Sequence, residues 1–415
     1  MTSRRAFLSS GGIALLAAGV GGVPSFLTRA AAATPAGPFR RRKVLVTVFQ
    51  RGAMDGLAAV QPLSDPHLAR LRPTLALDAR RQLVDLDGRY GLHPALAPFG
   101  DYFREGRLGI VHGAGSPVAT RSHFDAQDFM ESGVPGDKGA DSGWLNRATG
   151  LLGHEPATPF QAVALTPALP LALRGDAPSL AISNLEDFGV IPPGALRGAA
   201  AGETLEALYA QTAGDLLSDA GREGLDAARL LEEARLDQYT PENGAEYPRS
   251  ELGESLRQIA QLIKADVGLE VAFAEAGGWD THARQGAVDG SFGRRAEDLA
   301  QSVAAFWSDL ERYQDDVVVL TMTEFGRTVA ENGTGGTDHG RASAMFVLGN
   351  AVRGGEVHGV PLVLDPDALE DGRDLPVTTD FRALFAGVAG PHLGIATGDA
   401  LFPGWTGRPL DLVRP

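Results

Sequence analysis

The 415-residue sequence predicts a doubly wound α/β fold, in which a largely parallel sheet carries helices on both faces. From Arg41 onwards, short apolar runs alternate with amphipathic stretches, and no repeat of fixed period is visible. Most of the apolar runs lack polar alternation, which is typical of strands buried on both faces. The composition is 44% apolar and 21% charged, a balance that indicates a packed core and excludes intrinsic disorder.

Seven apolar runs are expected to form the strands, at residues 44–49, 108–112, 161–165, 179–182, 269–274, 317–322 and 344–348. Five amphipathic stretches are expected to form helices that cover the sheet, at residues 93–105, 124–131, 251–264, 296–312 and 380–389. Asp380 is the expected N-cap of the last helix. Residues 197–249 combine acid-rich helical segments with a polar stretch, and we interpret them as a helical insertion in a single domain over residues 34–415.

Residues 1–33 are predicted to form a cleavable export signal. The pair Arg4-Arg5 precedes a weakly apolar run that is broken by glycines and a proline, and an alanine-rich exit follows. The arginine pair resembles a bacterial twin-arginine signal, so we expect export by the twin-arginine machinery to the periplasm or the medium. A membrane anchor is the alternative, but the broken run predicts no stable membrane span after cleavage.

The composition also restricts the chemistry and the partners. The chain contains no cysteine, which excludes disulfides, thiolate metal ligands and a cysteine nucleophile, so any metal must use His, Asp, Glu or hydroxyl oxygen. Acidic residues outnumber Lys and Arg by 52 to 37, and the net charge of -15 gives no electrostatic footprint for nucleic acid. Small anions can still bind at local groups of arginine.

Five polar clusters stand at the ends of predicted strands or the starts of helices, where open α/β sheets place their ligands. They are RGAMDG, TRSHFDAQD, GGWDTH, TEFGR and GTDHGR. Of the nine histidines, only His123, His282 and His339 stand beside acids in these clusters. Carboxylate and imidazole are the ligands that zinc accepts when sulfur is absent, so this joint placement favours a metal site over a structural polar network.

Two of the clusters leave a choice of interpretation open. Asp55 stands between glycines directly after the first strand, where it suits a metal ligand and a turn-forming residue about equally. Ser122 precedes the helix predicted at residues 124–131, with Asp125 three positions on, which is typical of an N-cap. The same helix N-terminus would attract a phosphate or sulfate, and a metal there would make the hydroxyl a nucleophile.

Arginine lies close to several of these clusters and suits the recognition of an anion. The candidates for binding an anionic substrate are Arg121, Arg327 and Arg341.

The ordered motifs resemble a bacterial family catalogued as domain of unknown function 1501, whose members often begin with a twin-arginine signal. The matching motifs are RGAMDG, GLHPAL, GSPVATRSHFDAQDFMESG, GWLNR, GGWDTH, TEFGR, GTDHG and DGRDLPVTTDFRALF, and they run from about Val44 to Gly394. That family is in turn similar to the alkaline phosphatase and sulfatase superfamily. The resemblance implies an alkaline-phosphatase-like doubly wound sheet with a metal-dependent site that hydrolyses phosphate or sulfate esters.

The resemblance also implies roles for individual residues. Asp55 matches the acid ligand after the first strand, and the later ligands match Asp280, His282 and His339. The nucleophile of the superfamily begins a helix, which makes Ser122 the first candidate and Thr120 the second.

One departure from the superfamily lies after the strand at residues 317–322, where adjacent Asp and His are usual and this chain has Glu324 followed by Phe325. A two-metal site would lose one imidazole there, and whether Asp338 substitutes stays open. The lack of cysteine excludes a formylglycine made from cysteine, which favours phosphate over sulfate esters without excluding a serine-derived form.

We therefore predict a periplasmic or secreted metal-dependent hydrolase of an anionic small-molecule or glycan ester. The divalent metal is expected to be zinc, with Mn, Mg or Ca as alternatives, and its candidate ligands are Asp55, Asp280, His282, Glu324, Asp338 and His339. The alternative is a non-catalytic secreted binding or assembly protein that kept the fold and lost the chemistry. A phosphotransferase or mutase of the same superfamily is a third hypothesis.

Overall fold

The computed structural model describes residues 42–154, 156–185 and 239–414. The predicted export signal at residues 1–33 lies outside these ranges, as does the predicted insertion up to residue 238, and residues 239–249 contain no helix or strand. Apart from residues 156–159, the described residues belong to one compact unit. Within the described ranges, no helix is long and apolar enough to cross a membrane.

The centre of this unit is a nine-stranded sheet in the order β11-β5-β10-β9-β1-β8-β6-β7, with β12 paired to β5. Only β10 runs antiparallel to its neighbours, so the sheet is mixed and largely parallel, as predicted. The strands are β1 (Val44–Gln50), β5 (Leu108–Gly115), β6 (Ala162–Ala164), β7 (Leu180–Ala181), β8 (Val271–Ala276), β9 (Val317–Met322), β10 (Ser343–Leu348), β11 (Val357–His358) and β12 (Thr379–Asp380). All seven predicted strands are confirmed within a few residues of their expected ends.

Burial on both faces explains why these runs form strands. All seven residues of β1 are buried, and Leu45 pairs with Val271 on one side and Val318 on the other. An aliphatic side chain that is removed from water contributes roughly 1.5–3 kcal/mol, so a continuous apolar run is most stable in the centre of a covered sheet.

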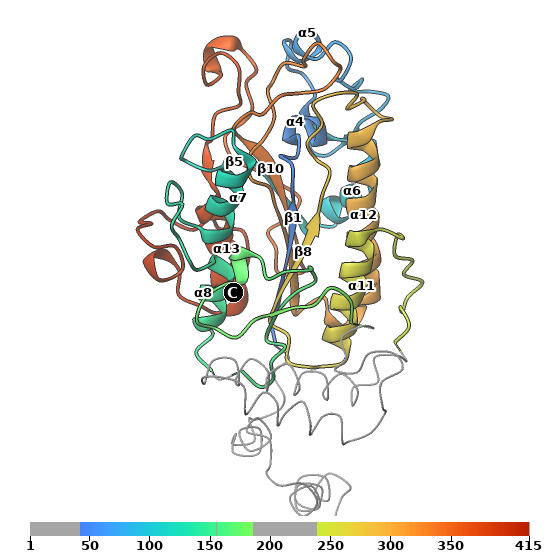
Figure 1. The fold of residues 1–415 in the computed structure, drawn as a ribbon. Helices are drawn as coiled ribbons and strands as arrows, with labels where there is room; N and C mark the ends of the chain where they lie inside the picture. The colour runs from blue at the N-terminus through green and yellow to red at the C-terminus, as the bar shows by residue number, and fades with distance from the viewer. Residues whose placement is uncertain (1–41, 155, 186–238, 415) are drawn as a thin grey trace, which may run out of the picture. The chain divides into compact units, whose positions relative to one another are not determined.

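Helices cover both faces of the sheet (Figure 1). On one side lie α7 (His123–Ser132), α8 (Trp144–Gly150) and α13 (Phe381–Leu393), and on the other lie α6 (Ala97–Arg104), α11 (Glu251–Lys264) and α12 (Ser291–Asp309). On the first side, Trp144 stacks on Phe385 with ring centroids 4.8 Å apart, and both belong to the core that includes Phe49 of β1. These contacts join α8 and α13 to the sheet.

The helix predictions are confirmed with differences at several ends: α12 stops at Asp309 and not at 312, and α13 continues to Leu393 and not to 389. The predicted N-cap of α13 is confirmed, because the Asp380 carboxylate accepts a hydrogen bond from the amide of Arg382. The predicted helix at residues 93–105 is shorter, since residues 94–96 form a 3-10 turn before α6. The predicted start of α12 at residue 296 is wrong, because the helix begins at Ser291. Gly293 in its first turn obscures this start, but a Cβ there would lie 2.2 Å from the carbonyl oxygen of Val288.

Several short elements had no strong sequence pattern and were not predicted. A three-stranded sheet in the order β2-β4-β3 contains β2 (Val60–Pro62), β4 (Tyr90–Leu92) and β3 (Val84–Asp85). In the sequence, the short helix α4 (Gly56–Ala59) precedes β2, and the short helix α5 (Leu68–Leu71) lies between β2 and β3.

Strand direction brings the polar clusters to one edge of the large sheet. The strands β1, β8, β9 and β5 point the same way, so the loops that follow them leave at the same edge, which the short helix α4 marks in Figure 1. Because β10 runs in the opposite direction, the loop that precedes it also lies there. This topology assembles a site from segments that are far apart in the sequence.

Candidate metal site

Three side chains meet at this edge with the geometry of metal ligands. His123 begins α7, Asp280 follows β8, and His339 precedes β10. The Nε2 atom of His339 lies 3.0 Å from Nε2 of His123 and 3.3 Å from Oδ1 of Asp280. The Oδ2 atom of Asp280 lies 3.6 Å from Nε2 of His123. Among the described residues, His123, Asp280 and His339 form a group that could hold a metal ion, because one ligand atom from each lies within 4.8 Å of the other two.

A fourth side chain, His282, adjoins the group. Its Nε2 atom lies 2.8 Å from Nε2 of His339 and 3.1 Å from Oδ1 of Asp280. The structure therefore brings together three of the predicted metal ligands, Asp280, His282 and His339. His123 lies with them.

The other nitrogen of each imidazole faces a hydrogen-bond acceptor. Nδ1 of His339 donates to the backbone carbonyl of Arg121 at 2.8 Å, and Nδ1 of His282 donates to Asp338 at 3.0 Å. Nδ1 of His123 donates to Oε1 of Glu324 at 2.8 Å. A neutral imidazole that donates from Nδ1 carries a lone pair on Nε2, so three lone pairs point into the same small volume. Acceptors of this kind orient histidines that bind metals.

This arrangement fits a bound cation. Facing lone pairs repel one another unless a proton or a metal ion lies between them. Ligands that surround zinc tetrahedrally at about 2.0–2.1 Å lie roughly 3.3 Å from one another. The two imidazoles lie 3.0 Å apart, His339 lies 3.3 Å from Oδ1 of Asp280, and His123 lies 3.6 Å from Oδ2 of the same carboxylate. The residues present therefore fit a zinc-sized ion bound by nitrogen and oxygen.

A buried arginine keeps Asp280 ionised. NH1 of Arg327, whose side chain is 0% exposed, donates to Oδ1 of Asp280 at 2.7 Å. Burial would raise the pKa of Asp280, but the hydrogen bond and charge of Arg327 bring it below its usual value. Burial lowers the pKa of His339, which therefore stays neutral and able to bind a metal through Nε2.

The structure places Glu324 behind His123. The Glu324 carboxylate is 0% exposed and accepts hydrogen bonds from the Gly52 amide at 2.8 Å and from Gln127 at 3.1 Å, as well as from His123. Burial would raise the pKa of Glu324, but these hydrogen bonds, led by that of His123, lower it. The hydrogen bond to Glu324 in turn raises the pKa of His123. Asp338 has the same relation to His282, so both predicted acids orient imidazoles.

Asp55 lies apart from these contacts. It is the N-cap of α4, where its carboxylate accepts from the Ala58 amide at 3.0 Å. It also accepts from Arg72 at 2.8 Å and from Gln285 at 2.7 Å. Burial would raise the pKa of Asp55, but Arg72 keeps it lowered. The turn-forming interpretation matches these contacts.

The two hydroxyl candidates lie beside His123 in the sequence. Ser122 is the N-cap of α7, and its Oγ accepts from the Asp125 amide at 3.4 Å. Oγ1 of Thr120 accepts from the Ser122 amide at 3.2 Å. Both hydroxyls therefore have a structural contact, and that of Ser122 is long.

Each of the three candidate anion-binding arginines has a carboxylate partner. Arg121 donates to Asp374 at 2.6 Å, and Arg341 donates to Glu370 at 2.9 Å. Arg327 is bound to Asp280. Of the three side chains only that of Arg121 is substantially exposed, at 43%.

His123 is the member of the site that was absent from the predicted ligands. The signal was its place among the three histidines beside acids, but the following helix favoured an interpretation centred on Ser122. Phe325, which follows Glu324, stacks on the His123 ring at 5.0 Å and lies 5.1 Å from the His339 ring. The third imidazole thus comes from α7, and the phenyl ring packs against two of the three.

Comparisons with known proteins give a family and distant structural likenesses. A family model described as "Protein of unknown function (DUF1501)" matches residues 110–401. Among curated proteins, no sequence matches the chain.

Three solved structures illustrate the likeness. The C-terminal periplasmic domain of EptC from Escherichia coli, in complex with Zn, matches 75% of this chain and 73% of its own at 9% identity and a TM-score of 0.34. Ps i-CgsB in complex with k-i-k-neocarrahexaose matches 88% of this chain and 75% of its own, at 9% identity and a TM-score of 0.38. A mutant of TAB5 alkaline phosphatase with Mg bound in the M3 site matches 75% of this chain and 92% of its own, at 12% identity and a TM-score of 0.31. Scores this low carry no argument, so the function is inferred from this chain's own residues.

Proposed function

The chain belongs to the family described as "Protein of unknown function (DUF1501)", and because that description gives no activity, we propose from the site that it is a metal-dependent hydrolase of phosphate or sulfate esters. The observation that carries the proposal is the convergence of three imidazole Nε2 atoms, those of His123, His282 and His339, on the carboxylate of Asp280. Each imidazole is oriented by an acceptor on Nδ1, as the ligands of catalytic metals are.

The donor set favours zinc. Imidazole nitrogen with one carboxylate oxygen suits zinc better than Mg or Ca, which prefer oxygen ligands, while Mn stays an alternative. When bound, a divalent metal stabilises the negative charge that develops on a phosphate or sulfate ester during its hydrolysis.

Residues at the start of α7 would bind and attack the ester. Ser122 lies one position before His123, at the positive end of a ten-residue helix, where an anion is stabilised. We assign Ser122 as the first candidate for the nucleophile and Thr120 as the second. Arg121, which is exposed and adjacent, would hold the anion through nitrogens that do not contact Asp374. Arg341 and Arg327 would support the site through Glu370 and Asp280.

Metal analysis and an activity screen test this function. The purified protein should contain about one zinc ion per chain and hydrolyse a member of a panel of phosphate and sulfate esters. Substitution H339Q should remove the metal and the activity together. A protein that holds no divalent metal after loading with Zn, Mn, Mg or Ca would contradict the proposal.

A non-catalytic binding protein is the second candidate. It is favoured by the contacts of Ser122, which caps α7, and by the three arginines, which all have carboxylate partners. A protein that binds zinc tightly but hydrolyses none of the esters in the panel would support this candidate.

Export by the twin-arginine route is part of the proposal and rests on the sequence of residues 1–33. The lack of cysteine is compatible with it, because the fold needs no disulfide to be formed after export.

A further inference from the structure

A continuous chain of hydrogen bonds leads from Arg51 to His123. NH1 of Arg51 donates to Oε1 of Gln127 at 3.0 Å, and Nε2 of Gln127 donates to Oε1 of Glu324 at 3.1 Å. The same oxygen of Glu324 accepts from Nδ1 of His123 at 2.8 Å. Arg51 follows β1, while Gln127 and His123 lie one turn apart on α7, so the chain joins the sheet to the helix that supplies an imidazole of the site.

The chemistry of the partners fixes the direction of this chain. A guanidinium only donates, so the amide oxygen of Gln127 must face Arg51. The Glu324 oxygen already accepts from the Gly52 amide and from His123, and a carboxylate oxygen in this role only accepts, so the amide nitrogen of Gln127 must face it. If the amide were rotated, its nitrogen would face the guanidinium of Arg51, donor against donor, and its oxygen would face the carboxylate of Glu324, acceptor against acceptor. Gln127 therefore helps to hold the Glu324 carboxylate in one orientation, with Oε1 of Glu324 facing Nδ1 of His123.

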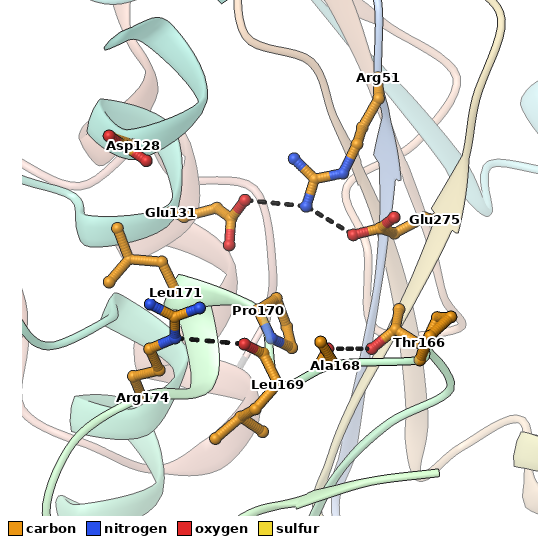
Figure 2. Close-up of a pocket in the computed structure, with 11 residues that line it drawn as sticks. Arg51, Asp128, Glu131, Thr166, Ala168, Leu169, Pro170, Leu171, Arg174 and Glu275 are labelled. Atoms are coloured by element: carbon orange, nitrogen blue, oxygen red, sulfur yellow. Dashed lines mark hydrogen bonds and ion pairs between the residues drawn. The ribbon is translucent and has the colours of Figure 1, made fainter. Parts of the chain in front are cut away.

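Arg51 is itself held at the wall of a cavity of about 360 Å³ (Figure 2). Its NH2 donates to Glu131 at 2.8 Å and to Glu275 at 2.5 Å, and its guanidinium carbon lies 4.3 Å from the centre of the Phe49 ring. Arg174 lines the same cavity but donates to the carbonyl of Leu169. Two arginines thus share a cavity, and only Arg51 contacts Gln127 in the described contacts.

We propose that Gln127 and Arg51 are positioning residues, which hold His123 in the orientation and the Nδ1–H form that a metal ligand requires. The proposal deepens the proposed function and rests on it, because it assigns residues outside the ligand group to the metal affinity of the site. Groups that hydrogen-bond directly to a metal ligand, as Glu324 does to His123, change metal affinity by roughly tenfold or more when they are substituted. Gln127 and Arg51 act through Glu324, so tenfold is the upper limit of the effect expected for them.

The first experiment measures zinc affinity by competition with a chromogenic chelator. Q127A removes the link and should weaken zinc binding by up to roughly tenfold. Q127E keeps an oxygen for Arg51 but sets a carboxylate against Glu324, so it should weaken binding at least as much. R174A changes the same cavity without touching the chain and should bind zinc like the wild type.

Chemical rescue tests the share of Arg51. R51A should weaken zinc binding, and guanidinium ion at millimolar concentration should restore part of the loss, because the cavity beside the missing side chain is open to solvent. Guanidinium should leave the zinc affinity of the wild type and R174A unchanged. Thermal unfolding of the metal-free variants shows which of them are folded, and Q127A removes no charge from the protein.

A second readout needs no metal. In the metal-free protein at a pH where histidine is neutral, ring ¹⁵N shifts should report a proton on Nδ1 of His123, and Q127A should shift part of the population to Nε2. If Q127A and Q127E bind zinc and hold this tautomer like the wild type, the positioning role is overturned. If the wild type binds no metal, the proposed function fails, and the tautomer measurement alone decides whether the chain positions His123.

Discussion

The ion pair between Asp55 and Arg72 allows the two interpretations of Asp55 to be separated by experiment. Both side chains are buried, with 1% and 2% exposed, and their contact is 2.8 Å. Arg72 also donates to the carbonyls of Val329 and Thr328, each at 2.8 Å, so it cannot follow a changed partner. Substitution D55N keeps the size of the side chain and the cap of α4 but removes the charge.

The cost of D55N follows from this burial. Removal of one partner of a buried pair leaves the other charge uncompensated and costs about 3–5 kcal/mol, where a surface pair would cost less than about 1 kcal/mol. We expect D55N to lower the free energy of unfolding by about 3–5 kcal/mol, a large part of the 5–15 kcal/mol that is usual for a domain. Zinc affinity should stay within about twofold, since Asp55 has no contact with the ligand group.

Urea unfolding of the metal-free protein measures the first effect, and chelator competition measures the second. The double variant D55N/R72M should be more stable than the sum of the single effects predicts, because it removes the uncompensated charge. H339Q is the matched control and should lose zinc at little cost in stability. The reasoning is wrong if D55N unfolds like the wild type and loses zinc, since Asp55 would then be the ligand that the family resemblance implies.

Three further predictions concern other parts of the chain. S122A should abolish ester hydrolysis and lower the free energy of unfolding by about 0.5–2 kcal/mol. S122G should also abolish hydrolysis, but should lower the free energy of unfolding by only a few tenths of a kcal/mol. Hydrolysis that survives in S122G would show that Ser122 is not the nucleophile. Burial lowers the pKa of His112 and His392 to about 4, so the unfolded chain takes up protons at a higher pH than the folded chain does. The free energy of unfolding should therefore fall by up to about 3 kcal/mol per histidine as the pH falls from about 6.5 to 4. Urea unfolding measures this, and a free energy of unfolding that stays constant over this pH range would refute it. Replacement of Arg4 and Arg5 by lysine should leave the protein in the cytoplasm on cell fractionation, and unchanged export would exclude the twin-arginine route.

The strands of the sheet were predictable because burial on both faces leaves a direct trace in the sequence. A run such as Val44–Gln50 has no solvated side, and five of its seven residues are apolar. Short elements such as α4 and α8 have no such trace, since four to seven residues are too few for a helical period. Their existence depends on tertiary contacts, as in the packing of Trp144 on Phe385.

The place of the site was predictable, but the role of each acid within it was not. Strand ends predicted which loops meet, and Asp280, His282 and His339 do meet. Whether an acid binds the metal or orients an imidazole depends on partners far away in the sequence. Glu324 faces His123, which is 201 positions away. No local pattern near Glu324 contains that information.

The charges of the site determine the order in which metal and substrate should bind. Three carboxylates, those of Asp280, Glu324 and Asp338, contact the imidazoles, and one guanidinium, that of Arg327, contacts Asp280. With neutral imidazoles, three negative charges against one positive leave the site with a net charge of about two negative units. Two unit charges 4 Å apart interact by about 4 kcal/mol at an effective dielectric constant of 20, so an anionic ester would be repelled from this site.

A divalent cation cancels that charge and reverses the preference. The nearby arginines do not replace it, because Arg121 and Arg373 are paired with Asp371 and Asp374, and Arg341 is paired with Glu370. The binding of inorganic phosphate should therefore require the metal, whereas the binding of the metal should not require phosphate. On the proposed function, the affinity of this acidic protein for an anionic ester would therefore depend on the cation that its own carboxylates attract.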